Sequence, residues 1–296
     1  MAKPSARRPE NVEGDFYVDT TCIDCDTCRW MAPSVYRSAG DQSAVHHQPT
    51  SEAERLAALQ ALLSCPTASI GTVEKPADIL AAQESFPIPV AENVYHCGYH
   101  AESSFGAASY LIVRPEGNVL VDSPRFAPPL VRRLEALGGV RTLYLTHRDD
   151  VADHRRWHEH FGCERVLHSD EVGHSTRDVE LQITGEDAFA LAPDLTVLPV
   201  PGHTKGHTVL LYRERFLFSG DHLAWSDRLG HLIAFRGACW YSWSEQLRSM
   251  RRLSAYPFEW VLPGHGRRAH AERETMARSL ARCIAWMEGA SNDDGW

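Results

Sequence analysis

The sequence THRDDVADH at residues 146–154 decides how this chain is interpreted. It directly follows the apolar run 140–145, which is typical of a buried strand. Imidazoles and carboxylates that follow the end of a strand lie side by side on a loop, and nitrogen and oxygen donors that converge on one point bind metal ions. The stretch therefore predicts a metal site that begins at His147.

Three further strand-like runs end in the same kind of residue. The runs 195–200, 215–218 and 260–262 precede the sequences PGHTKGH at 201–207, SGD at 219–221 and PGH at 263–265. Glycine before His or Asp is also typical of an ordinary tight turn. Four such strand ends in one chain instead favour a shared rim that carries His147, His203, Asp221 and His265. The alternation of strand-like and helix-like segments around them indicates an α/β layered fold.

The ordered set of motifs resembles the metallo-β-lactamase superfamily, whose signature is Thr-His-x-His-x-Asp-His, then a lone His, a lone Asp and a last His. The resemblance covers about residue 87 to the C-terminus. It implies a four-layer αββα sandwich with two metal ions at one edge of its sheets. It also implies that Asp221 bridges the two ions and that Asp153 is a catalytic residue, which orients the nucleophile or carries its proton. The implied metal ligands are His147, Asp149, Asp153, His154, His203, Asp221 and His265.

The stretch departs from that signature in two ways. It is two residues longer, and an Asp stands where the second His is expected. Asp149 has the expected offset of two from His147 and is the preferred ligand, with Asp150 as the alternative. Carboxylate oxygens are harder ligands than imidazoles and move the preference from zinc towards iron or manganese. Members of the superfamily with Glu at this position are flavodiiron proteins, so the two divalent ions are expected to be iron or zinc.

A second motif lies near the N-terminus. The sequence CIDCDTC at 22–28 has the spacing C-x₂-C-x₂-C, and Cys65-Pro66 follows much later. Together with APSVY at 32–36, these residues resemble a single-cluster bacterial ferredoxin. The resemblance implies a [4Fe-4S] cluster bound by Cys22, Cys25, Cys28 and Cys65. A four-cysteine zinc site is the alternative, but zinc sites usually pair their ligands as two C-x₂-C knuckles.

The predicted domains follow from these motifs. We expect a disordered tail at 1–14, an α+β ferredoxin-like domain at 15–73, a linker at 74–86 and the metallo-β-lactamase-fold domain at 87–296. Hydrophobic residues make up 43% of the chain, enough for a sizeable core. The net charge of -9 argues against a nucleic-acid partner, which needs a basic face. No apolar run is long enough for a membrane span, and no apolar region follows the basic N-terminus, so a cytoplasmic location is expected.

Two functions from different classes follow. The first is a two-metal hydrolase of an ester, thioester or amide, because GHTKGH at 202–207 resembles glyoxalase II, with His207 in support of His203. The alternative is a redox enzyme whose diiron centre takes electrons from the cluster and reduces oxygen or nitric oxide. A non-catalytic redox sensor is a third possibility. A small-molecule substrate is expected, with a redox partner protein if the cluster exchanges electrons. The residues that are candidates to line a substrate pocket, and so form a substrate wall, are Trp225, Trp240, Tyr241 and Trp243.

Overall fold

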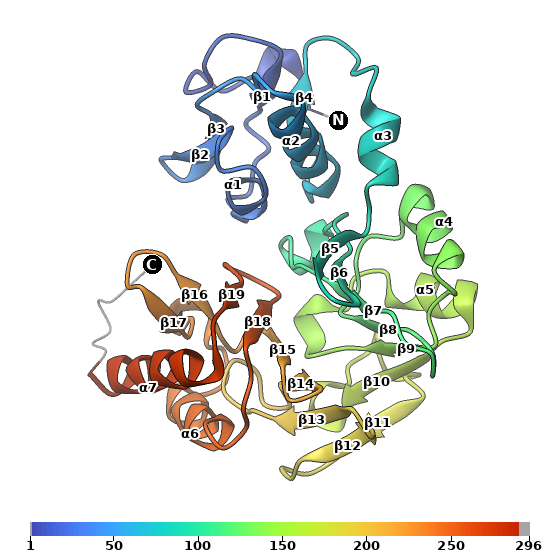
Figure 1. Cartoon of the computed structure of the whole chain (residues 1–296), viewed down its shortest axis with the longest axis vertical. Helices are drawn as coiled ribbons and strands as arrows, with labels where there is room; N and C mark the ends of the chain where they lie inside the picture. Colours follow the sequence, from blue (N-terminus) through green and yellow to red (C-terminus); the bar gives the residue numbers. More distant parts are fainter. Residues whose placement is uncertain (1, 290–296) are drawn as a thin grey trace. The chain divides into compact units, whose positions relative to one another are not determined.

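The computed structural model describes residues 2–289, which contain short strands and helices throughout (Figure 1). Contacts divide the chain into two compact units. The first unit comprises residues 1–142 and 152–163, and the second comprises 143–151 and 164–296. The strand β9 (Thr142–Tyr144) spans the boundary between the units.

The N-terminal part of the first unit has the predicted α+β character. Its central helix α2 begins with a capping box, in which Ser51 accepts from the backbone of Glu54 and the Glu54 side chain accepts from the backbone of Ser51. The strand β1 pairs antiparallel with β4, and β2 pairs with β3. The elements are η1 (Pro4–Ala6), β1 (Phe16–Val18), α1 (Thr27–Met31), β2 (Tyr36–Ala39), β3 (Gln42–Val45), α2 (Glu52–Ser64) and β4 (Ile70–Thr72).

The first residues correct the prediction of a disordered tail at 1–14. Within residues 2–14, the side chain of Arg8 is buried and donates hydrogen bonds to the backbone oxygens of Ser43 and Ala39. The side chain of Asn11 donates to the backbone oxygen of Val18. These polar side chains hydrogen-bond to the backbone of the neighbouring strands. A reading of net charge and sequence position alone does not detect such bonds.

The rest of the first unit begins with the short helix α3 (Ile79–Glu84), which lies within the predicted linker at 74–86. Four strands follow, β5 (Ile88–Ala91), β6 (Val94–His96), β7 (Tyr110–Ile112) and β8 (Val119–Val121), and each pairs antiparallel with the next. The short helix η2 (Glu102–Ser104) lies between β6 and β7. The helices of this region are α4 (Pro128–Ala136) and α5 (His154–Phe161).

The second unit contains a six-stranded sheet in the order β12-β13-β14-β15-β18-β19. The helices α6 and α7 pack against it through a core that includes Leu211, Leu217, Met250 and Leu280 (Figure 1). The sheet elements are β12 (Phe189–Ala192), β13 (Leu195–Pro199), β14 (Thr208–Tyr212), β15 (Phe216–Gly220), β18 (Trp260–Pro263) and β19 (Ala269–His270). The others are η3 (Arg148–Asp150), β10 (Glu164–His168), η4 (Ser169–Glu171), β11 (Leu181–Ile183), β16 (Ala224–Ser226), β17 (His231–Ile233), η5 (Arg236–Ala238), α6 (Trp243–Leu253) and α7 (Arg273–Gly289).

The strand directions explain why distant motifs converge. β13 and β15 each pair antiparallel with β14, and β15 pairs parallel with β18. All three strands therefore point the same way, and their carboxyl ends meet at one edge of the sheet. His203, Asp221 and His265 follow those ends, as predicted.

The helix α7 begins at Arg273, after the two-residue strand β19 (Ala269–His270). The segment from Ser169 forms only the short turn η4. Among residues 2–289, no helix has the length and apolar character needed to cross a membrane.

Candidate metal centre and cysteine site

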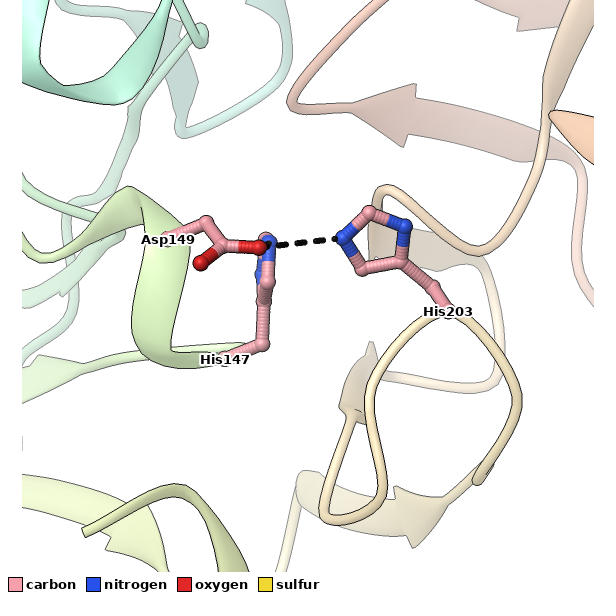
Figure 2. A group of neighbouring side chains, drawn as sticks. All are labelled: His147, Asp149 and His203. Carbon is pink, nitrogen blue, oxygen red and sulfur yellow. Dashed lines mark ion pairs between the residues drawn. The ribbon is translucent and has the colours of Figure 1, made fainter. Parts of the chain in front are cut away.

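Three side chains of the second unit converge as the sequence predicted (Figure 2). Nε2 of His203 lies 3.4 Å from Oδ2 of Asp149, and Nε2 of His147 lies 3.7 Å from the same oxygen. Ligands at about 2.0–2.2 Å from a tetrahedral ion are separated by about 3.3–3.6 Å. The spacing of these three donors is therefore close to that of ligands around one metal ion.

Asp221 lies within reach of every histidine in the group. Its Oδ2 atom is 3.7 Å from Nε2 of His147, 3.6 Å from Nε2 of His203 and 3.8 Å from Nε2 of His265. A carboxylate has two oxygens and can offer one to each of two ions. The position of Asp221 therefore agrees with the bridging role that the resemblance implies.

Asp150 forms part of a second group with His147 and Asp221, whose donor atoms all lie within 4.8 Å of one another. Its Oδ1 atom is also 4.0 Å from Nε2 of His265. From the sequence, Asp149 and Asp150 are alternatives for one ligand position. The structure brings both carboxylates to the group, Asp149 beside His203 and Asp150 beside His265. The short turn η3 carries both residues, and its tight spacing directs the two side chains to different partners.

Unpaired buried atoms support a metal ion at this group. Within residues 2–289, Nε2 of His147, Nε2 of His203 and Oδ1 of Asp221 are buried and have no hydrogen-bond partner. Buried polar atoms normally have one, and a bound cation is a common substitute. A Cβ atom on Gly264 would lie 2.7 Å from Oδ2 of Asp150 and 2.9 Å from Oδ1 of Asp221. Glycine at 264 thus keeps space open beside the two carboxylates.

The protonation states also suit metal ligands. Burial lowers the pKa of His147 to about 4, so its imidazole is neutral at pH 7 and has a lone pair for an ion. The nearby imidazole of His203, whose Nε2 atom lies 3.4 Å from Oδ2, lowers the pKa of Asp149, which is therefore ionised. Burial lowers the pKa of His203, but Asp149 and Asp221 outweigh that effect and raise it. The negative field that raises this pKa also attracts a divalent cation.

Two buried residues hold the ligand loops. Nε2 of His207 accepts a hydrogen bond from the backbone N–H of Asp221 at 3.1 Å, so it supports Asp221 rather than His203 as first expected. Glu171 accepts from the backbone N–H of Arg148 at 3.0 Å and from that of Gly206 at 2.6 Å. It therefore connects the loop after His147 to the loop after His203. Glu171 is not among the site residues predicted from the sequence, because a single Glu on a short turn has no distinctive pattern.

Asp153 and His154 fall in the first unit, at the start of α5. Oδ2 of Asp153 accepts a hydrogen bond from the backbone N–H of Phe126 at 2.7 Å and lies 3.8 Å from a guanidinium nitrogen of Arg156. His154 is buried. Their roles as metal ligands, and the catalytic role of Asp153, remain predictions.

An exposed aromatic segment adjoins His203. The backbone N–H groups of Trp240 and Tyr241 both donate to the backbone oxygen of His203, at 2.9 and 3.0 Å. Trp240 is 67% exposed and Tyr241 is 49% exposed, unusual values for large aromatic side chains. Of the four aromatic candidates for a substrate wall, these two combine exposure with direct attachment to a candidate ligand. His222, which directly follows Asp221 in the sequence, is buried, and burial lowers its pKa to about 3.

The four predicted cluster cysteines line one pocket of the first unit. Sγ of Cys22 accepts from the backbone N–H of Ser43 at 3.5 Å, and Sγ of Cys65 accepts from that of Ser69 at 3.3 Å. Such bonds stabilise thiolates bound to iron. Burial raises the pKa of Cys25 to about 11 and that of Cys28 further, so these thiols need a metal to ionise at neutral pH. The set therefore fits an iron–sulfur cluster.

Comparison with known families identifies this segment. Residues 18–72 match the family described as the 4Fe-4S single cluster domain of Ferredoxin I. The match confirms the predicted ferredoxin segment and supports a cluster over a zinc site.

Comparison with solved structures identifies the remaining fold. The structure of VMB-1 at pH 5.5 matches with a TM-score of 0.52 and 18% identity, over 68% of this chain and 95% of that chain. The DIM-1 metallo-beta-lactamase exposed to ceftazidime matches with a TM-score of 0.53 and 19% identity, over 69% and 96%. At these identities the matches show the fold alone. The chain thus carries a ferredoxin segment and a metallo-β-lactamase fold, as the sequence predicted.

Proposed function

We propose that this chain, a ferredoxin segment joined to a metallo-β-lactamase fold, is a metal-dependent hydrolase with two divalent ions in its second unit. The observation that carries the proposal is the convergence of six donors on one rim. His147, Asp149 and His203 form one group, and Asp150 and His265 approach Asp221, which is shared.

The donor set has three carboxylates and three imidazoles. Oxygen donors favour harder ions, so iron(II) or manganese(II) is the proposed metal in preference to zinc. When bound, a pair of such ions polarises a substrate carbonyl and lowers the pKa of water to near neutrality. This chemistry suits the hydrolysis of an ester, thioester or amide.

The protein residues supply position and access. His207 and Glu171 hold the loops that carry Asp221, His147 and His203, which fixes the ligands before substrate binds. The exposed rings of Trp240 and Tyr241 offer an apolar surface beside His203 on which part of a substrate can rest. Asp153 is proposed to carry the proton of the nucleophile, with one of its oxygens already bonded to Phe126.

A direct test is hydrolysis by protein reconstituted separately with iron(II), manganese(II) and zinc. The probes are p-nitrophenyl acetate, an acyl thioester and a chromogenic β-lactam. Asp221→Ala and His203→Ala should abolish the hydrolysis of any probe that the wild type accepts. Asp170→Ala is the matched control, because Asp170 is an exposed residue paired with Lys205, and it should retain full activity. Hydrolysis that survives Asp221→Ala would contradict the proposal.

A redox function is the second candidate, and one observation favours it. The same oxygen-rich donor set suits two redox-active irons, and the chain carries a ferredoxin segment that can hold an electron-carrying cluster. If this candidate holds, protein with iron in the second unit and a chemically reduced cluster should consume oxygen or nitric oxide, and Asp221→Ala should stop it. The redox function would be excluded if oxygen and nitric oxide reoxidise the reduced wild-type protein no faster than the reduced Asp221→Ala variant.

A further inference from the structure

The cysteine pocket has a neighbour outside the ferredoxin segment. The loop from Tyr99 to Ala107 joins β6 to β7, and it belongs to the same compact unit as the four cysteines. The family match ends at residue 72, so the ferredoxin model does not include this loop. Its contacts with the pocket are specific and buried.

The first contact is made by Gly106. A Cβ atom at this position would lie 2.9 Å from Cβ and 3.1 Å from Sγ of Cys25, and 3.2 Å from Cγ of Pro66. The backbone of Gly106 also has a φ of +85°, which other residues rarely adopt. Only glycine therefore allows the loop to approach Cys25 this closely.

The second contact is a chain of hydrogen bonds. Sγ of Cys25 bonds to Oγ1 of Thr27 at 3.4 Å, and Oγ1 of Thr27 bonds to Nδ1 of His100 at 3.0 Å. Thr27 is 1% exposed and His100 is 0% exposed, so water does not compete for either group. Nδ1 of His100 also lies 2.7 Å from the backbone oxygen of Gly106.

These distances fix the direction of the bonds. A carbonyl oxygen only accepts, so Nδ1 of His100 carries a hydrogen and donates it to Gly106 and Thr27. Thr27 then accepts from His100, and its own hydroxyl hydrogen has two acceptors at 3.4 Å, Sγ of Cys25 and the backbone oxygen of Gly106. The Gly106 oxygen already accepts from His100, and an ionised sulfur is the stronger acceptor, so the hydroxyl donates to Cys25. A cysteine sulfur that binds iron is a thiolate and only accepts, so the chain runs from His100 through Thr27 to Cys25.

A second histidine, His96, contacts the other ring nitrogen of His100. Nε2 of His96 lies 2.9 Å from Nε2 of His100, and His96 is also fully buried. Two facing nitrogens at this distance share one hydrogen. A neutral His100 with its hydrogen on Nδ1 has a bare Nε2, so His96 is then the donor between them. Trp30, which directly follows the helix residues Cys28 and Arg29, packs against both imidazoles, with ring centroids 5.1 and 6.1 Å away.

We propose that His100 is a positioning residue for the iron–sulfur cluster, and that it orients Thr27 so that the hydroxyl donates to Cys25 and raises the reduction potential of the cluster. Hydrogen bonds to cluster sulfurs are among the factors that set this potential. Such a bond stabilises the reduced cluster more than the oxidised one, because the reduced cluster carries the larger negative charge. The proposal rests on the cluster in the ferredoxin segment and is independent of the metal centre in the second unit.

The test is the midpoint potential of the cluster in the full-length, anaerobically purified protein, measured by spectroelectrochemical titration with mediator dyes. Iron and sulfide are quantified first in each variant. Thr27→Val removes the hydroxyl and keeps the shape of the side chain. His100→Asn keeps a donor at the place of Nδ1, whereas His100→Gln keeps only a partner for Nε2 of His96.

Thr27→Val and His100→Gln should lower the potential by a similar amount, and His100→Asn should retain the wild-type value. His100→Gln should add no further shift to Thr27→Val, because both act through one bond. The matched control is Thr67→Val, whose hydroxyl lies 3.8 Å from Sγ of Cys65, and the shifts of Thr67→Val and His100→Gln should add.

Three outcomes would overturn the proposal. Equal potentials in wild type, Thr27→Val and His100→Gln, with intact clusters, would show that the chain does not act on the cluster. Loss of the cluster in His100→Asn as well as in His100→Gln would show that His100 only fills space beside the pocket. Loss of the cluster in His100→Gln and Thr27→Val alone would instead support the proposal. Wild-type protein without iron and sulfide in the first unit would remove the cluster itself. None of these results depends on hydrolytic activity.

Discussion

Asp149 and Asp150 are adjacent in the sequence, yet their carboxylates face different histidines. Asp149 lies 3.4 Å from Nε2 of His203, and Asp150 lies 4.0 Å from Nε2 of His265. Both aspartates lie on the turn η3, and Asp221 lies near both histidines. One short segment thus offers an oxygen ligand to each end of the proposed two-metal centre, which replaces the imidazole expected there.

This relationship predicts the metal content of single variants. Asp149→Ala and Asp150→Ala should each lose about one ion from the second unit, because each removes one ligand from a different position. Asp170→Ala should retain both ions. The measurement is elemental analysis after anaerobic purification, with the iron of the cluster subtracted by its sulfide content. A variant that loses an aspartate yet keeps full metal content would show that this carboxylate is not a ligand.

The sequence predicted the rim because His147, His203, Asp221 and His265 each follow an apolar run. The strands before His203, Asp221 and His265 point the same way in one sheet, so their carboxyl ends meet at one edge, whereas β9, before His147, belongs to another sheet. It did not predict the parts played by Asp149 and Asp150, because a turn of three residues directs side chains by its backbone geometry, not by spacing. The role of Glu171 was not predicted either, because its hydrogen-bond partners are backbone N–H groups far away in the chain. The contact of His100 with the cysteine pocket joins positions 73 residues apart. A contact between residues so far apart in the chain leaves no local pattern in the sequence.

His207 should control metal affinity without being a ligand. His207→Ala removes the acceptor for the backbone N–H of Asp221, so Asp221 loses its orientation. Loss of such a support typically weakens metal binding by about 10–100-fold. Competition with a fluorescent chelator measures the affinity. His270→Ala, a change on the exposed end of β19, is the control and should leave affinity unchanged. Equal metal affinity in His207→Ala and His270→Ala would show that His207 does not hold Asp221 in place for metal binding.

Trp240 should contribute to substrate binding if the second unit is a hydrolase. Its ring is 67% exposed, and its backbone is bonded to His203. Trp240→Ala should raise KM for an accepted aromatic ester by about 10-fold, because an apolar contact surface is lost, and metal content should not change. Phe189→Ala removes another exposed aromatic ring, on β12, and should leave KM unchanged. The expectation fails if both variants have the wild-type KM.

The pair of Arg165 and Glu180 should make stability depend on pH. Burial raises the pKa of Glu180, but hydrogen bonds from Arg165 outweigh it and lower the pKa from 4.5 to about 2. The stabilisation is therefore complete above about pH 4.5 and is lost as the pH falls towards about 2. Glu180→Gln should destabilise the protein at pH 7 by about 1–2 kcal/mol, since the carboxylate is partly exposed to solvent.

Thermal unfolding of wild type and Glu180→Gln, compared over a range of pH, measures this effect. The difference in melting temperature should be constant between pH 5 and 7 and should narrow below about pH 4.5. A difference that grows as the pH falls would have the wrong sign for an ionised carboxylate paired with Arg165.

The central claim is that adjacent aspartates help to hold two hard metal ions, and anomalous diffraction from crystals grown anaerobically tests it most directly. Data collected at the iron, manganese and zinc edges should give two peaks in the second unit. One is expected among His147, Asp149 and His203, and the other among Asp150, Asp221 and His265, with the signal of iron or manganese. A single zinc peak whose ligands exclude both Asp149 and Asp150 would contradict the account.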